Sequence, residues 1–233
     1  MPKQTTTNPI ARRQFLRKVL SCAVTGAVMT GIEVALPRPL LAQTPLTPDA
    51  ALRELMTGNE RFDNNQLTSV EHDLRMLKEN TVEKQEPFAA VLACADSRVP
   101  IELIFDQTIG HIFVTRVAGN IVTPAILASL EYAVAVLGVK VLLVLGHTGC
   151  GAVKAAMKAD AVPGQISALY QYIQPSVEHA GGDVGKAIAN NAQFQANLLR
   201  TSSTVIRDAL KAAKVRVKSG VYDLATGKVT LHG

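Results

Sequence analysis

Three short runs of apolar residues stand out along the chain, at 88–93, 112–114 and 141–145. No polar position interrupts any of them, and each contains β-branched or aromatic residues, which is typical of strands buried on both faces. Segments with apolar residues at helical spacing lie between and after these runs. Fully apolar strands that alternate with helices predict the α/β class, with a mainly parallel central sheet flanked by helices.

Helix signals and turn residues predict the remaining elements. The stretch 225–227 (Ala-Thr-Gly) separates two β-branched runs, so it predicts a C-terminal hairpin. Thr47-Pro48-Asp49 and Thr123-Pro124 are typical helix starts, and Gly138 is a typical stop. We expect helices from about 48, near 74–77, from 124 to about 137, over 151–158, over most of 163–180 with an interruption at Pro175, and from 184 to about 213 with a break at 201–203.

The basic charge of the chain is concentrated at its N-terminus. The chain has 24 Lys and Arg against 19 Asp and Glu, and residues 1–42 hold six of the basic side chains but only one acidic one. Residues 43–233 therefore carry 18 charges of each sign. Aromatic residues make up only 4 % of the chain, which disfavours a surface for stacking bases. We expect no nucleic-acid partner.

The N-terminal segment has the pattern of an export signal. Arg12-Arg13-Gln14-Phe15-Leu16 precedes 14 uncharged residues at 19–32, too few to cross a bilayer as a helix. This order resembles a twin-arginine export signal. We expect residues 1–42 to be that signal, with cleavage after Ala42, and residues 43–233 to be an exported domain in the periplasm, or in a thylakoid lumen or cell envelope. An uncleaved anchor or a disordered basic tail is the alternative.

A candidate metal site follows from the ends of two predicted strands. Cys94 comes directly after the first apolar run, while His147 and Cys150 come after the third. The carboxyl ends of parallel strands meet at one edge of a sheet, so we expect these side chains to lie close together. Two thiolates and one imidazole suit Zn²⁺ and leave a fourth position open, as in catalytic zinc sites. A Cys94–Cys150 disulfide is the alternative.

Asp96 and Arg98 lie beside the first of these cysteines. A bidentate guanidinium–carboxylate pair would fix the orientation of Asp96 and keep it ionised. Next to a metal-bound water, such a carboxylate can accept a hydrogen bond and orient the water. The alternative is a solvated surface ion pair worth about 0–1 kcal/mol.

Four motifs follow one another along the chain: Cys94-Ala95-Asp96-Ser97-Arg98-Val99-Pro100, Glu102-Leu103-Ile104-Phe105-Asp106-Gln107, Arg116-Val117-Ala118-Gly119-Asn120 and Gly146-His147-Thr148-Gly149-Cys150-Gly151. In this order they resemble the β-class carbonic anhydrases, and the similarity extends from about Leu52 to the end of the chain. The resemblance implies one Zn²⁺ per chain held by Cys94, His147 and Cys150. It also implies a catalytic Asp96–Arg98 dyad and a homodimer or a larger homo-oligomer.

The resemblance further implies an activity and two substrate-binding residues. The expected reaction is the reversible hydration of CO₂ to bicarbonate and a proton by a zinc-bound hydroxide. Gln85 and Phe105 match substrate-binding positions of the plant-type subgroup, whereas Ala95 replaces the serine common in the family. Hydrolysis of CS₂ or COS at the same zinc is one alternative function. A non-catalytic bicarbonate-binding or scaffold homologue is another.

Overall fold

The computed structural model describes residues 44–69 and 84–232, which belong to one structural unit formed by Leu40–Gly233. The predicted signal segment, with its twin-arginine motif, and the helix expected near 74–77 lie outside the described residues. No helix within the described ranges is both long enough and apolar enough to cross a membrane.

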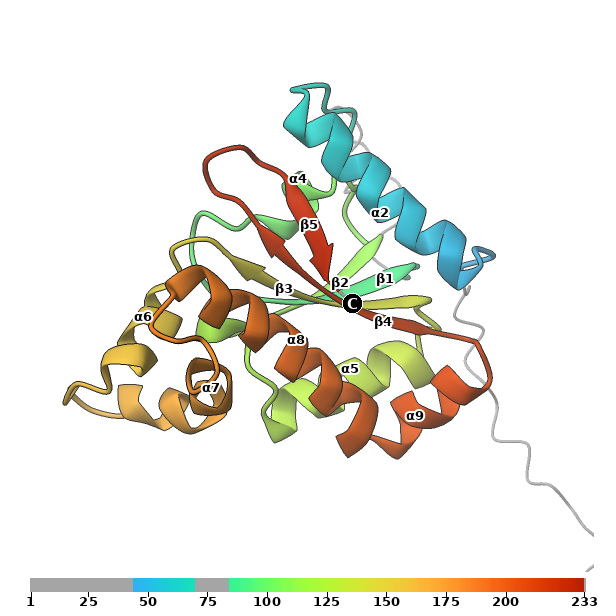
Figure 1. Cartoon of the computed structure of the whole chain (residues 1–233). Helices are drawn as coiled ribbons and strands as arrows, with labels where there is room; N and C mark the ends of the chain where they lie inside the picture. Colours follow the sequence, from blue (N-terminus) through green and yellow to red (C-terminus); the bar gives the residue numbers. More distant parts are fainter. Residues whose placement is uncertain (1–43, 70–83, 233) are drawn as a thin grey trace, which may run out of the picture. The chain divides into compact units, whose positions relative to one another are not determined.

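A five-stranded sheet forms the centre of this unit, with the strand order β2-β1-β3-β4-β5 (Figure 1). The first four strands in that order are parallel, and β5 pairs antiparallel with β4. The strands are β1 (Ala89–Ala93), β2 (Ile112–Arg116), β3 (Val141–His147), β4 (Arg216–Tyr222) and β5 (Val229–His232). The sequence-based prediction of an α/β fold with a mainly parallel sheet and a C-terminal hairpin is confirmed.

Helices cover both faces of the sheet, so the central strands β1 and β3 are apolar except for His147 at the end of β3. Every residue of β1 and of β3 is buried. Successive β1 side chains alternate between two cores, since Val91 lies in one and Leu92 in the other. The first core packs beneath α2, and the second packs beneath α5, α8 and α9 (Figure 1).

The helices begin largely where the sequence places its capping residues. Thr47 caps α2, Thr123 caps α5 and Asp183 caps α8, each with its side-chain oxygen accepting from a backbone amide of the first turn. The longer helices are α2 (Pro48–Asp63), α5 (Pro124–Ala135), α6 (Gly151–Lys158), α7 (Tyr170–Val177), α8 (Val184–Ser202) and α9 (Thr204–Lys211). Short turns of helix occur at α4 (Ile101–Ile104), η1 (Ala118–Asn120) and η2 (Ile166–Leu169).

One predicted break is confirmed and another is wrong. Ser203 separates α8 from α9, and its hydroxyl accepts from the Ile206 amide as the cap of the second helix. Pro175, by contrast, does not interrupt its helix, because α7 runs through it to Val177. The proline removes one backbone hydrogen bond, to the carbonyl of residue 171, and Gln171 is an exposed residue, which keeps the loss small.

Candidate metal centre

The three predicted ligand residues meet at the carboxyl ends of β1 and β3. Cys94 follows β1, and His147 is the last residue of β3. Ala93 and Leu145 are register partners, so Cys94 and His147 lie close together at the same edge of the sheet. The ligand atoms of Cys94, His147 and Cys150 all lie within 4.8 Å of one another, and all three residues are buried.

The turn after β3 brings the second cysteine back toward the first. Gly149 adopts a φ of 72°, in the left-handed region that favours glycine. This turn places Cys150 as the residue that caps α6, with the backbone amides of Ala152 and Val153 beside its sulfur. The spacing His147-Thr148-Gly149-Cys150 thus closes a tight loop around the cluster.

The two sulfurs have the separation that a shared metal ion requires. Cys94 Sγ and Cys150 Sγ are 4.0 Å apart, and neither cysteine is in a disulfide. Two thiolates bound to one tetrahedral Zn²⁺ lie about 3.8 Å apart when each Zn–S bond is about 2.3 Å. A disulfide would need about 2.05 Å between the sulfurs. The geometry therefore fits a metal site, and not the alternative disulfide.

His147 presents one nitrogen to the cluster and uses the other to fix its ring. Its Nδ1 lies 3.0 Å from the carbonyl oxygen of Thr148, so Nδ1 carries the hydrogen and donates it. Its Nε2 is buried and has no hydrogen-bond partner among the described residues. A buried polar atom without a partner is costly. The unpartnered lone pair points to a ligand that would complete this site.

The hydrogen bond between the two cysteines shifts their pKa values in opposite directions. The hydrogen bond with Cys150 lowers the pKa of Cys94 well below its ordinary value, and burial only partly opposes this. The same hydrogen bond raises the pKa of Cys150. Burial works against the charged form of His147, but Cys94, the Thr148 carbonyl and Asp96 together raise its pKa. A metal ion that binds here must displace any protons that its ligand atoms carry.

Asp96 is held beside the cluster by Arg98. Its Oδ1 accepts from the Arg98 backbone amide at 3.0 Å and from Nε at 2.9 Å, and its Oδ2 accepts from Nη2 at 2.8 Å. This pairing lowers the pKa of Asp96 far below its usual range. Oδ2 also lies 3.8 Å from His147 Nε2. The carboxylate is therefore ionised, fixed in direction and next to the candidate metal position.

Arg116 supports the site, although its sequence context indicated no role beyond membership of a motif. From the end of β2, its Nε donates to the carbonyl oxygen of Cys94 at 3.0 Å, and its Nη2 donates to that of Asp96 at 2.5 Å. It thereby holds the backbone that carries both residues. A charged residue at the end of a strand next to β1 was the only sequence signal available.

The structure does not bring Gln85 and Phe105 to this cluster. Gln85 is exposed and precedes β1, so it lies at the opposite end of that strand from Cys94. Phe105 is fully buried in the core beneath α2, so within one chain its side chain faces no open cavity. Their substrate-binding roles stay predictions.

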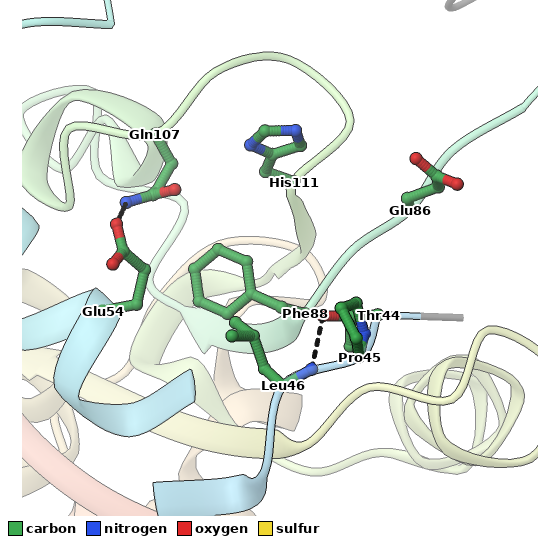
Figure 2. Close-up of a pocket in the computed structure, with 8 residues that line it drawn as sticks. All are labelled: Thr44, Pro45, Leu46, Glu54, Glu86, Phe88, Gln107 and His111. Carbon is green, nitrogen blue, oxygen red and sulfur yellow. Dashed lines mark hydrogen bonds between the residues drawn. The ribbon is translucent and has the colours of Figure 1, made fainter. Parts of the chain in front are cut away.

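A separate cavity of about 350 Å³ lies where β1 and β2 begin (Figure 2). Glu54 on α2 accepts from Gln107 there at 3.3 Å, and Glu86 also lines the cavity. None of its lining residues is Lys or Arg, so it does not favour an anion such as bicarbonate. The lining residues are Thr44, Pro45, Leu46, Glu54, Glu86, Phe88, Gln107 and His111.

Comparisons with known proteins point to one family. The family model described as "Carbonic anhydrase" matches residues 89–229. The chain is 35 % identical over 193 residues to a carbonic anhydrase of Mycolicibacterium smegmatis, covering 79 % of this chain and 93 % of the relative. It is 34 % identical over 197 residues to carbonic anhydrase 2 of Mycobacterium tuberculosis, with the same coverage.

Solved structures give the same result. The β-carbonic anhydrase CcaA aligns with a TM-score of 0.63 at 26 % identity, covering 78 % of this chain and 87 % of that protein. CafA, a β-carbonic anhydrase of Aspergillus fumigatus, aligns with a TM-score of 0.63 at 25 % identity, covering 78 % and 90 %.

Proposed function

The chain belongs to the β-class carbonic anhydrases, and from that premise we propose that it is a zinc enzyme that hydrates CO₂ reversibly outside the cytoplasm. The observation that carries the zinc assignment is the buried cluster of Cys94, His147 and Cys150 with its unpartnered Nε2. When bound, Zn²⁺ supplies Lewis acidity, which makes water a nucleophile near neutral pH. Two sulfurs and one imidazole nitrogen are a donor set that zinc favours.

Asp96 orients the reacting water in this proposal. A carboxylate offers about four acceptor positions, and Arg98 fills three of those on Asp96. The remaining position is on Oδ2, the atom nearest His147 Nε2. Asp96 can accept the water's hydrogen there, while Arg98 keeps it ionised and prevents it from rotating.

The charges at the rim suit the product. Arg98 is 60 % exposed in its side chain, and Arg116 is exposed at the end of β2. Both guanidinium groups lie at the mouth of the site, since both contact Asp96 or its backbone. Positive groups at the rim attract bicarbonate for the reverse reaction.

Stopped-flow hydration of CO₂, combined with metal analysis of the full chain, tests the proposal. We expect about one zinc per chain, by the ligand count of a single site, and turnover that is lost when a chelator removes the metal. A zinc-free, disulfide-bonded protein with full activity would contradict it. CS₂ and COS are assayed in parallel, because turnover of these alone would favour the alternative hydrolase. Bicarbonate binding without turnover would favour a scaffold.

Export is a second part of the proposal, and it depends on residues 12–16, which lie outside the described residues. Twin-arginine transport carries folded proteins, so the cysteines would acquire their metal before they reach an oxidising compartment. Replacing Arg12 and Arg13 together by Lys should retain the protein in the cytoplasm. Cell fractionation measures this, with Arg38→Lys as the matched control. Unchanged export of the double variant would contradict the proposal.

Self-association is the third part. Helix α5 is mostly apolar, with Ser129 and Glu131 as its polar residues, a pattern usual for buried helices. Yet Tyr132 is 45 % exposed and Ala128 is also exposed. A second copy of the chain would cover this face. Ala128→Arg should then shift the mass measured by analytical ultracentrifugation toward the monomer, while Gln193→Arg on the exposed side of α8 should not. An unchanged mass for Ala128→Arg would place the interface elsewhere.

A further inference from the structure

Two buried amide side chains on α8 have no role in the reaction proposed above. Asn191 is 1 % exposed and Gln195 is fully buried. They are four residues apart, so they lie on the same face of the helix. Buried amides are costly unless they are hydrogen-bonded, so their partners indicate why they are there.

Their partners lie at the turn that follows β2 and on α7. Asn191 Nδ2 donates to the carbonyl oxygen of Gly119 at 2.8 Å. Gln195 Nε2 donates to Asn191 Oδ1 at 3.3 Å and to the Tyr172 carbonyl at 2.8 Å. Gln195 Oε1 accepts from the Val122 amide at 2.8 Å. Because Gln195 occupies Asn191 Oδ1, the amide group of Asn191 must present its nitrogen to Gly119.

Gly119 connects this pair to a metal ligand. Its backbone N–H donates to Cys94 Sγ at 3.4 Å, while its carbonyl accepts from Asn191. Its φ is 77°, and a Cβ there would lie 2.8 Å from Ile173 Cδ1. The positive φ and the nearby Ile173 favour glycine at this position. Its N–H and its carbonyl belong to two peptide planes that meet at its Cα, so a hydrogen bond that fixes the carbonyl also limits where the N–H points.

We propose that Asn191 is a positioning residue for the metal ligand Cys94, acting through Gly119, and that Gln195 holds Asn191 in the required orientation. The inference rests on the proposed function, since it concerns the sulfur that would bind the metal. An N–H group aimed at a thiolate withdraws electron density from it and fixes its direction. Supporting groups of this kind typically change metal affinity by about 10- to 100-fold.

Cobalt substitution gives two measurements that should stay unchanged if Asn191 has only a structural role. The full chain is loaded with Co²⁺, and the thiolate-to-cobalt charge-transfer band and the rate of metal loss to a chelator are measured. In Asn191→Leu the sulfur becomes more electron-rich and less fixed. The band should shift to longer wavelength, and metal loss should be at least about 10-fold faster. Gln195→Met should shift both readouts in the same direction by less.

Asn190→Leu is the matched control. Asn190 is the neighbouring asparagine of α8, but its Nδ2 donates to the Ser176 carbonyl of α7 at 3.4 Å and not to the turn. The variant should lose this hydrogen bond between α8 and α7 while keeping the wild-type band and rate.

The outcomes separate the hypotheses. Wild-type readouts in Asn191→Leu, or equal shifts in Asn190→Leu, would overturn the positioning role. If Asn191→Leu does not fold, Gln195→Met decides by the same criteria. A wild-type protein that binds cobalt with thiolate bands but hydrates no CO₂ would contradict the proposed function. The band and the rate of metal loss could still be compared among the variants, so the positioning role would still be tested. A wild-type protein that binds no metal would overturn both.

Discussion

Two aspartate–arginine pairs in this molecule have the same chemistry, but they differ in whether the carboxylate keeps a free hydrogen-bond acceptor position. Asp96 pairs with Arg98 beside the metal cluster, and Asp106 pairs with Arg61 near the end of α2. Both carboxyl groups have a pKa far below the usual range. A lowered pKa alone therefore does not identify the reactive pair.

Asp106 has all its acceptor positions filled. Oδ1 accepts from the backbone amides of Thr68 and Ser69, each at 2.9 Å. Oδ2 accepts from Arg61 Nε at 2.5 Å and from the Thr68 hydroxyl at 2.8 Å. Its side chain is fully buried, and burial works against its charge, which these four donors outweigh. The pair ties the segment after α2 to the turn after α4.

Asp96 differs by one acceptor position and by its neighbour. It has three donors, all from Arg98, and its side chain is 18 % exposed. The remaining position faces a buried cluster whose own Nε2 has no hydrogen-bond partner among the described residues. In a structural pair, protein donors fill every acceptor position of the carboxylate. In a pair that takes part in chemistry, one acceptor position stays available for the reactant.

Removing a ligand of the metal cluster should have the largest effect on activity. In Cys150→Ser the hydroxyl is a poor zinc ligand, so the protein should lose its metal, and CO₂ hydration should fall to the uncatalysed background. Metal analysis and stopped-flow assays measure both. Asp106→Asn is the control and should keep its zinc. A Cys150→Ser protein with full zinc content and activity would remove the reason for assigning chemistry to Asp96.

Breaking the first pair should lower turnover by about 100- to 10,000-fold, the range of groups that orient and move protons. Arg98→Ala frees Asp96 to reach the fourth ligand position, so the variant should keep its zinc but bind azide poorly. Asp96→Asn should lose turnover and still bind azide, because the position stays open. Near-normal activity or wild-type azide binding in Arg98→Ala would reduce this pair to a structural one.

Breaking the second pair should affect stability rather than turnover. In Asp106→Asn, an amide NH₂ replaces the oxygen that accepts from Arg61 and Thr68, leaving buried groups unsatisfied. We expect a loss of about 2–4 kcal/mol in the free energy of unfolding, measured by urea denaturation, with normal turnover per folded molecule. Asp63→Asn, an exposed control at the end of α2, should change stability by less than about 0.5 kcal/mol. Equal stability of the two variants would contradict the structural assignment.

The smallest effect is the dependence of that stability difference on pH. Asp106 has a lower pKa in the folded protein than in the unfolded chain, where it is about 3.9. Its stabilisation is therefore complete above about pH 5 and is lost as the pH falls through the folded pKa. Metal-free wild type and Asp106→Asn should differ equally at pH 7 and pH 5, and by less at pH 3. A difference that grew on acidification would contradict this linkage.

Local sequence patterns predicted the parts of the fold that depend on local chemistry. The apolar runs at 88–93 and 141–145 became β1 and β3, although β3 extends two residues further, to His147. Ser203 breaks α8 from α9 because its hydroxyl caps the second helix. Pro175 was misjudged because α7 continues through it with the loss of one backbone hydrogen bond, and tertiary packing, which the sequence alone does not specify, decides whether a helix accepts that loss.

The sequence by itself determined the sheet, its helical layers and the meeting of Cys94, His147 and Cys150, because apolar strands must be buried and parallel strands end at one edge. Only the tertiary structure decided which polar residues support that site. Arg116 reaches Cys94 across 22 positions of sequence, and Asn191 reaches Gly119 across 72. It also separated the structural Asp106 from Asp96, because the two carboxylates differ in which donors surround them, and those donors are brought together only by folding.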